Sequence, residues 1–528
     1  MKRFVEKIRR LKESLFGNKQ DPPENGLSNN VKSETDPPAS DATQRKIAVK
    51  LDETKSRVPK SESDEINFDF ADQLSDRPNK RAPYYIQIGL DFGTAYSKCV
   101  CRDVNTNEAW VYISPRFAGH EMECLYPSLL KFKDNVVSYT AEPGLHYKDE
   151  SLYHLKWALK EAASGQWDSQ VLKYYGETSG LRNNKDLVQF VKSCAIYFLA
   201  TTLGEIRGNL IRRFNNFGKH PDDYMAVNLG IPVAFAEKTE LRDFYYGILY
   251  DSWGLADKLA GHPSIKYEDL KGLCDERKFQ FDNSIQDACF LVPEVSANLQ
   301  GFVKSRVSMP GTYLFSDTGA ATVDQCIFTF TRKKYEEKLN YLHADVLPLG
   351  SSQIEFIAAS KDTDNGQSQC DLLEKWRSCK ENGADEFELK YACRQIAEKL
   401  SFHTQRNLAI SRKKLFCHDQ LEDTKIIFGG GGHCDNPYKE AVLSPFLNPV
   451  IFTKSINPSI IGVPKPTDLS LHDRHNHWMS RLSVAYGLSF NKFDLAQYLF
   501  PSEIENPTPD KIWQPQASKK MAPTKDEC

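Results

Sequence analysis

The feature that most constrains the fold of this chain is a short pattern in residues 84–100. An apolar run over 85–90 ends at Asp91, and such a run favours a strand. Gly93 then opens a turn of small and polar residues, and a second apolar stretch follows. The turn offers backbone N–H groups and hydroxyls to a phosphate, and the carboxylate beside it can hold a hydrated metal ion. Taken alone, the segment fits an ordinary hairpin equally well.

The same pattern occurs a second time in residues 311–328. An apolar run over 312–315 enters an acidic turn, and another apolar run follows it. The turn contains Asp317, Gly319, Thr322 and Asp324. Further along, the apolar triplet 426–428 leads into the four glycines 429–432, where a flat ring or a sugar can lie against bare backbone. The two copies predict two related lobes that face one phosphate chain.

In this order, the three pieces resemble the nucleotide-binding fold shared by actin, sugar kinases and the DnaK-type heat-shock chaperones. The chaperone branch is the most similar. Eight short motifs carry the resemblance, at residues 88–97, 126–129, 153–156, 230–235, 292–297, 349–350, 392–405 and 484–487. The resemblance implies an α/β protein with a two-lobed actin-like ATPase fold, in which duplicated ribonuclease H-like lobes surround a nucleotide cleft.

The resemblance covers residues 84–490 and implies a division of the chain into parts. These are lobe I (83–310), lobe II (311–476), a helix that returns to lobe I (477–492) and a tail (493–528). In the chaperones a large β-rich substrate domain follows the nucleotide domain, and we expect no such module here. Three polar stretches are interpreted as surface insertions, near 160–185, 252–288 and 360–390.

The resemblance implies that carboxylates hold the metal. Asp91 and Asp317 would position a hydrated Mg²⁺ against the phosphates of bound ATP or ADP, and Asp324 would add an outer carboxylate. Asp91 and Asp317 each end an apolar strand, where an unpaired carboxylate is costly, so a purely structural role explains them poorly. Asp324 is also compatible with a turn residue at a strand end.

By match to the same family, turnover depends on Lys156, Glu294, Asp317 and Thr322. Lys156 would stabilise developing charge and help to orient the attacking water, and Glu294 or Asp317 would accept its proton. The hydroxyls of Thr94 and Thr322 would donate hydrogen bonds to phosphate oxygens. From the residues alone, a solvated helix lysine is the favoured interpretation of Lys156, and Glu294 is compatible with a residue that caps a helix start.

The other nucleotide contacts implied by the resemblance lie in the two turns, on an adenosine-side helix and in the glycine run. They are Gly93, Thr94, Ala95, Tyr96, Gly319, Ala320, Ala321, Ser401, Gly430, Gly431 and Gly432. The second turn departs from the family, because Ala320 and Ala321 stand where the family has glycines. Methyl groups therefore occupy positions where the backbone should approach phosphate closely.

The base-recognition residues depart further from the family pattern. Where the family has charged adenine contacts, this chain has Arg394, Ala397 and Glu398, and only Ser401 persists. A position that is acidic in the family is Arg481 here. The sequence therefore predicts nucleotide binding and leaves the preferred base open.

The N-terminal region is expected to be separate from the nucleotide domain. Residues 1–17 are predicted to form a basic amphipathic helix with Phe4, Ile8, Leu11 and Leu15 on one face and six Lys/Arg against two Glu. Residues 18–82 are rich in polar residues and proline, which predicts disorder. The helix would dock onto a partner protein or a membrane surface, or fold back onto the globular part.

Composition restricts the remaining classes of function. The net charge of −3 gives no bulk attraction to nucleic acid. The 13 cysteines include no C-x-x-C pair, which favours free thiols in the cytoplasm over a zinc site. The densest apolar run, 194–203, is too short to span a bilayer and is predicted to belong to a buried helix over 187–214. We expect a cytoplasmic protein, with peripheral membrane contact as an option.

Together these features favour an ATP-binding protein and Mg²⁺-dependent ATPase that acts as a nucleotide-controlled conformational switch for a partner protein. Three alternatives stay open: a small-molecule kinase of the sugar-kinase type, an actin-like filament former, and a pseudo-enzyme that binds nucleotide without hydrolysis. The alanines in the second turn and the lost adenine contacts make the pseudo-enzyme plausible.

Overall fold

The computed structural model describes residues 81–505 with short gaps. The gaps are residues 140–141, 143–146, 278–282, 306–307, 334–335, 363–366, 416, 418, 435–436, 449–450, 453, 464, 472–474 and 476–477. The chain divides after Lys80, and every described residue belongs to the unit Arg81–Cys528. The helix predicted for residues 1–17 lies outside the described residues, as does nearly all of the segment 18–82 predicted to be disordered.

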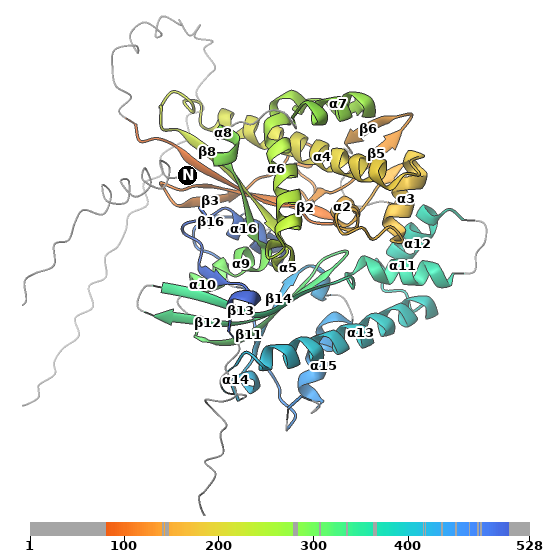
Figure 1. Ribbon diagram of the computed structural model, residues 1–528, viewed down its shortest axis with the longest axis vertical. Helices are drawn as coiled ribbons and strands as arrows, with labels where there is room; N and C mark the ends of the chain where they lie inside the picture. Colours follow the sequence, from red (N-terminus) through yellow and green to blue (C-terminus); the bar gives the residue numbers. More distant parts are fainter. Residues whose placement is uncertain are drawn as a thin grey trace, which may run out of the picture. The chain divides into compact units, whose positions relative to one another are not determined.

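Two large mixed sheets form the centre of this unit (Figure 1). The first has the strand order β10-β8-β1-β2-β3-β16, and β4 pairs with β2. Its strands are β1 (Tyr85–Asp91), β2 (Tyr96–Asp103), β3 (Glu108–Val111), β4 (Tyr126–Pro127), β8 (Tyr224–Ile231), β10 (Cys289–Pro293) and β16 (Leu469–Ser470). The second has the order β15-β14-β11-β12-β13-β17. Its strands are β11 (Gly311–Thr318), β12 (Val323–Lys333), β13 (Glu336–Leu347), β14 (Lys425–Gly430), β15 (Ile460–Ile461) and β17 (Gln497–Leu499).

The two sheets have the same connections at their centres. β1 pairs antiparallel with β2 and parallel with β8, just as β11 pairs antiparallel with β12 and parallel with β14. β2 continues antiparallel to β3, and β12 to β13. β8 continues parallel to β10, and β14 to β15. The repeated sequence pattern therefore corresponds to a repeated sheet topology, and the prediction of an α/β protein is confirmed.

The strands predicted from apolar runs are all present. The run 85–90 lies in β1, the run 312–315 lies in β11 and the triplet 426–428 lies in β14. β1 and β11 are buried along most of their length. Strands that are covered on both faces have continuous rather than alternating apolar sequences, and this explains why these runs were visible in the sequence.

We call residues 81–310 the first half of the unit and residues 311–505 the second half. Helices and a small third sheet complete the first half. The third sheet has the order β7-β5-β6-β9, with β5 (Leu130–Lys133), β6 (Val136–Tyr139), β7 (Ser151–Leu152) and β9 (Ser264–Lys266). The helices are α2 (Leu155–Ala163), α3 (Gln170–Ser179), α4 (Asn184–Arg213), α5 (Val233–Ala236), α6 (Thr239–Leu259), α7 (Tyr267–Arg277), α8 (Asn283–Ala288), α9 (Glu294–Asn298) and α10 (Gln300–Val303). The second half adds α11 (Ser352–Lys361), α12 (Gln369–Glu381), α13 (Phe387–Arg412), α14 (Asp419–Glu422), α15 (Tyr438–Leu447) and α16 (Met479–Leu488).

Helix α4 is the centre of the first core. Its start is capped by Asn183, whose side chain accepts a hydrogen bond from the backbone N–H of Lys185. By length and composition α4 could cross a membrane, but 83% of its most apolar window is buried inside the protein. It packs against α6 (Figure 1). The prediction of a buried helix over 187–214 is confirmed, and α4 is a core helix.

Two expectations about surface segments need correction. The polar stretches 160–185, 252–288 and 360–390 each contribute a helix with buried residues, including Tyr175 on α3 and Trp376 on α12. Within the segment expected as a tail, 493–528, β17 pairs parallel with β13 at the edge of the second sheet, and the residues after 505 lie outside the described part of the chain. In the three polar stretches the composition hid a few buried residues on one face, whereas β17 is held by its pairing with β13.

Helix α16 lies near the end of the second half in the sequence and packs onto β1 and β2 of the first sheet. The contacts of α16 require glycine at two places, on β1 where it meets α16 and on α16 where it meets α9. A Cβ on Gly89 of β1 would lie 2.3 Å from the carbonyl oxygen of Ala485, and a Cβ on Gly487 would lie 1.7 Å from that of Ala297 on α9. This contact places the start of α16 next to the ends of the central strands.

Candidate functional site

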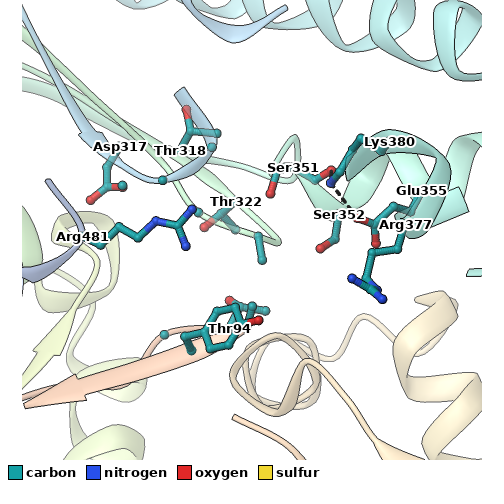
Figure 2. A pocket seen from close by; sticks show the side chains of 18 of the residues that line it. Thr94, Asp317, Thr318, Thr322, Ser351, Ser352, Glu355, Arg377, Lys380 and Arg481 are labelled. Atoms are coloured by element: carbon teal, nitrogen blue, oxygen red, sulfur yellow. Dashed lines mark hydrogen bonds and ion pairs between the residues drawn. The ribbon is translucent and has the colours of Figure 1, made fainter. Parts of the chain in front are cut away.

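A cavity of about 870 Å³ lies where strands of both large sheets end (Figure 2). It is lined by most of the predicted site residues, namely Asp91, Gly93, Thr94, Ala95, Tyr96, Lys156, Glu294, Asp317, Gly319, Ala320, Thr322, Asp324, Gly430, Gly431 and Gly432. Two predicted residues are not part of the lining. Ala321 is buried in the core, and Ser401 lies further along α13.

The two acidic turns come together because β1 and β11 both end at this cavity. Asp91 is the last residue of β1, and Asp317 is the second-last residue of β11. In the hairpin registers, Asp91 is opposite Lys98 and Asp317 is opposite Asp324. Both carboxylates border one cavity, which is the arrangement that a shared phosphate site requires.

The carboxylates of the second turn are electrostatically crowded. Burial, together with the negative charges of Glu294 and Asp91, raises the pKa of Asp317 to about 7. Burial and the charges of Glu294 and Asp317 likewise raise the pKa of Asp324 to about 8. Within the described residues, Oδ1 of Asp324 is buried without a hydrogen-bond partner. The cluster is therefore stabilised by any positive charge that enters the cavity.

Lys156 and Glu294 form an ion pair at the cavity wall. Lys156 is in the first turn of α2 and Glu294 begins α9, and Nζ lies 2.5 Å from Oε1. The two side chains are only 14% and 12% exposed, so Lys156 is not a solvated helix lysine. Burial lowers its pKa, but the charges of Glu294 and Asp91 outweigh this effect, and the net shift is upward. Lys156 is thus a fixed cation at the cavity.

The glycines 429–432 all leave too little room for a Cβ unless a neighbour moves, and Gly430 is also fixed by its backbone conformation. Gly430 has a φ of +73°, and a Cβ there would lie 2.3 Å from Oδ1 of Asp317. A Cβ on Gly431 would lie 2.5 Å from Nε of Arg481. By contrast, the atom nearest to a Cβ on Gly319 is the carbonyl oxygen of Thr322 at 3.4 Å. A side chain at Gly319 would fit the fold and take up space in the cavity.

The structure adds two cations that the sequence analysis did not assign to the site. Nζ of Lys98 lies 2.8 Å from Oδ2 of Asp91, and Arg481 of α16 also lines the cavity. A signal for Lys98 was available, because a tight hairpin after Asp91 places it opposite that residue. Arg481 was noted only as a departure from the family pattern, and nothing in the sequence shows that it reaches the phosphate turns.

The cavity extends beyond the turns to α11, α12 and the start of α13. Glu355 accepts hydrogen bonds from Nζ of Lys380 at 2.6 Å and from the hydroxyl of Tyr147 at 2.8 Å. Arg377 also lines this end and pairs with two carboxylates on its own helix. Figure 2 shows Glu355, Arg377 and Lys380 at one end and Asp317 at the other. These residues lie in polar helical sequence with no motif that could have identified them.

The positions that correspond to the family's adenine contacts do not reach the cavity. Arg394 and Glu398 pair with each other at 2.8 Å, and their side chains are 78% and 56% exposed. The cavity is lined instead by the first turns of α13, through Leu389, Lys390 and Cys393. Any base bound here would therefore meet a different set of side chains from the one that the resemblance implies.

The carboxylates of the cavity fit a hydrated magnesium ion better than an enclosed metal. Among the described residues, no three His, Cys, Asp or Glu side chains are grouped so that they could hold a metal ion. Asp91, Asp317 and Asp324 are hard oxygen donors, and Mg²⁺ keeps several of its waters when it binds beside phosphates. These three residues could hold such an ion through water.

No protein-family model matches the chain, and no curated protein matches it significantly. The resemblance to the DnaK-type chaperones therefore gains no independent support from these comparisons.

Proposed function

We propose that the protein binds ATP and ADP in this cavity and is a Mg²⁺-dependent ATPase with the two-lobed actin-like fold of the DnaK-type chaperones. The observation that carries the proposal is the meeting of Asp91 and Asp317 in one cavity. They come from equivalent strands of two sheets with the same connections. This duplication supports ribonuclease H-like lobes, one on each side of a nucleotide.

The residues of the cavity supply what phosphoryl transfer needs, which is charge neutralisation and positioning. The hydroxyls of Thr94 and Thr322 would donate hydrogen bonds to phosphate oxygens. Bound Mg²⁺ would neutralise part of the polyphosphate charge. Lys156, oriented by Glu294 at 2.5 Å, would stabilise the charge that develops on the transferred group. Glu294 would accept the proton of the attacking water.

We also propose that the nucleotide controls how the two halves contact each other and that a partner protein detects this change. The support is a set of contacts beside the cavity. Tyr147 of the first half hydrogen-bonds Glu355 of α11, and the rings of Trp157 and Phe356 lie 5.5 Å apart at 83°. A phosphate chain that binds both turns would favour the arrangement of the two halves in which these contacts form. Its hydrolysis would remove this preference.

A small-molecule kinase is the second candidate. The observation that favours it is the polar end of the cavity near Arg377 and Lys380, which leaves room for a phosphate acceptor beyond the two turns. Transfer of phosphate to a metabolite rather than to water would decide for this alternative.

Calorimetric titration with ATP, ADP and GTP, with and without Mg²⁺, tests the proposal together with a phosphate-release assay. Gly319→Val should weaken ATP binding at least about tenfold, or ~1.4 kcal/mol, because its side chain occupies the cavity. Gly462→Val is the matched control, since nothing lies within 4 Å of a Cβ there. A parent protein that binds none of the nucleotides contradicts the proposal. Tight binding without phosphate release would identify a pseudo-enzyme.

A further inference from the structure

The ammonium group of Lys98 lies in the part of the cavity that the two acidic turns form. Lys98 is opposite Asp91 in the hairpin register, and its Nζ lies 2.8 Å from Oδ2 of Asp91. The side chains of Lys98 and Asp91 are only 16% and 8% exposed. Lys133, which pairs with Glu150 at the same distance, is 64% exposed. Lys98 is therefore largely buried at the cavity wall, in contrast to the solvent-exposed Lys133.

This ammonium group lies beside the turn that follows Asp91. Nζ of Lys98 lies 3.3 Å from the point that a Cβ on Gly93 would occupy. Gly93 and the adjacent Thr94 both line the cavity. A phosphate oxygen that accepts hydrogen bonds from this turn would come within reach of the ammonium group. Lysine serves phosphate as a point charge of this kind.

A second cation reaches the same cavity from α16. Figure 2 shows the guanidinium group of Arg481 pointing into the cavity. Its Nε lies against Gly431, where a Cβ would be only 2.5 Å away. In the part of the chain that the structure describes, its partner is the ring of Trp478, 4.9 Å from the guanidinium carbon, and no carboxylate pairs with it. A guanidinium group without an acidic partner is well suited to bind phosphate.

We propose that Lys98, assisted by Arg481, is a built-in counter-ion of the polyphosphate, so that this protein binds ATP without a divalent cation. The inference rests on the proposed nucleotide site and adds how the charge of the ligand is neutralised there. Together with Lys156, the chain supplies three cationic side chains around the phosphates. The affinity of a polyphosphate depends on such charges and on hydrogen bonds, whatever their source.

The ion pair between Lys98 and Asp91 also affects where a metal can bind. A hydrated ion that uses Oδ2 of Asp91 must first displace the ammonium group, and an enclosed carboxylate stripped of its partner is unfavourable. Asp317 and Asp324 remain available to an ion when hydrolysis takes place. Binding and turnover then have different requirements, because the side-chain cations hold the nucleotide and Mg²⁺ supports the reaction.

The test is calorimetric titration of the full chain with ATP in excess EDTA and again in excess Mg²⁺. The parent protein should bind with dissociation constants that agree within about threefold in the two buffers. Lys98→Met should bind at least about tenfold more weakly than the parent in EDTA and recover most of this loss in Mg²⁺. Lys98→Arg keeps the charge and should behave like the parent. Lys133→Met removes a solvent-exposed lysine from an ion pair and is the control.

The outcomes separate this inference from the proposed function. Binding of ATP by the parent only when Mg²⁺ is present overturns the inference and leaves the nucleotide site in place. A Lys98→Met variant that matches the parent in EDTA overturns it as well. No binding in either buffer contradicts the proposed function itself. If Lys98→Met does not fold, as thermal melting would show, the parent and Lys98→Arg titrations still decide the question.

Discussion

The hydroxyl of Tyr147 donates a hydrogen bond to Oε2 of Glu355 at 2.8 Å, although 208 positions separate the two residues in the chain. The same hydroxyl lies 2.8 Å from Nε2 of His154, which immediately precedes α2 and has a φ of +55°. Burial and the charge of Lys380 lower the pKa of His154 to about 3, so its ring is neutral. A buried relay therefore joins the start of the helix that carries Lys156 to α11 of the second half.

Tyr147→Phe should loosen this link. The variant loses one buried hydrogen bond, which corresponds to about 1 kcal/mol of stability, and it should release nucleotide faster. Stopped-flow dissociation of a fluorescent ATP analogue measures the effect. Tyr197→Phe is a suitable control, because it removes a hydrogen bond to the carbonyl of His262 within the first half. Equal dissociation rates in the two variants would show that the link does not respond to nucleotide.

Asp317→Ala should abolish Mg²⁺-dependent hydrolysis, with a loss of at least about a hundredfold or ~2.7 kcal/mol in the barrier. The carboxylate lies at the end of β11 in the cavity and would hold the hydrated ion. Steady-state phosphate release is the measurement. Ser401→Ala is the control, since Ser401 does not line the cavity, and it should hydrolyse ATP at the parent rate. If Asp317→Ala hydrolyses ATP at the parent rate, the role of Asp317 in holding the metal ion is wrong.

Lys156→Ala should lose turnover while it still binds nucleotide. Its ammonium group would act on charge that develops during the reaction, so the loss should be larger in kcat than in affinity. Single-turnover hydrolysis and calorimetry on the same preparation separate the two effects. Lys160→Ala, on the same helix and paired with Glu161 at 3.0 Å, should leave both unchanged. Hydrolysis at the parent rate in Lys156→Ala would show that the role assigned to Lys156 is wrong.

The elements that the sequence predicted well are those in which burial imposes a pattern. β1, β11, β14 and the middle of α4 (193–204) are buried along most of their length, and each contains a dense apolar run. Helices with one buried face were harder to predict. In α12 only Cys370, Leu373 and Trp376 are buried among polar residues. Three apolar residues in a polar stretch are too few to indicate a buried helix face. The short strand β17 is identified only by its pairing with β13, which is a tertiary contact.

The candidate site shows the same division between local and distant information. Asp91, Asp317 and their turns follow from local patterns, and the structure brings them to one cavity. Glu355, Lys380 and Arg481 enter that cavity through the packing of helices far apart in the sequence, and no local pattern marks such residues. The implied contact at Ser401 was transferred by motif alone, and it does not line the cavity that the structure forms.

The stability of the ligand-free protein should decrease as pH rises from about 4 to about 8. Asp317 titrates near 3.8 when unfolded and at about 7 in the folded protein. Between these values the folded state holds a proton that the unfolded chain has lost, so the free energy of unfolding falls with pH. Asp317→Asn removes this group, so its melting temperature should depend less on pH and exceed that of the parent at pH 8. Asp168→Asn changes a fully exposed carboxylate and is the control. Parallel curves for the parent and Asp317→Asn would contradict the prediction.

A chain that starts at Arg81 should fold and bind ATP like the full chain, because the division after Lys80 leaves the whole cavity in the remaining unit. This starting point keeps the side chain of Arg81. Its guanidinium group pairs with Asp223 at 2.5 Å, and the backbone N–H of Tyr84 donates to the same carboxylate at 2.8 Å. These contacts fix the start of β1 onto the loop before β8. Burial raises the pKa of Asp223, but the hydrogen bonds from Arg81 and from the backbone outweigh this effect and lower it overall.

A second truncation that starts at Ala82 tests whether this anchor matters. It leaves Asp223 without its cation, so we expect a lower melting temperature than for the chain that starts at Arg81, with similar affinity for ATP. Because the pKa of Asp223 is lowered by folding, the contribution of Arg81 is present at neutral pH and is lost as the pH falls below about 4. The two truncations should therefore differ in melting temperature at pH 7 and converge in acid. Aggregation of the chain that starts at Arg81 would show instead that residues 1–80 belong to the folded core.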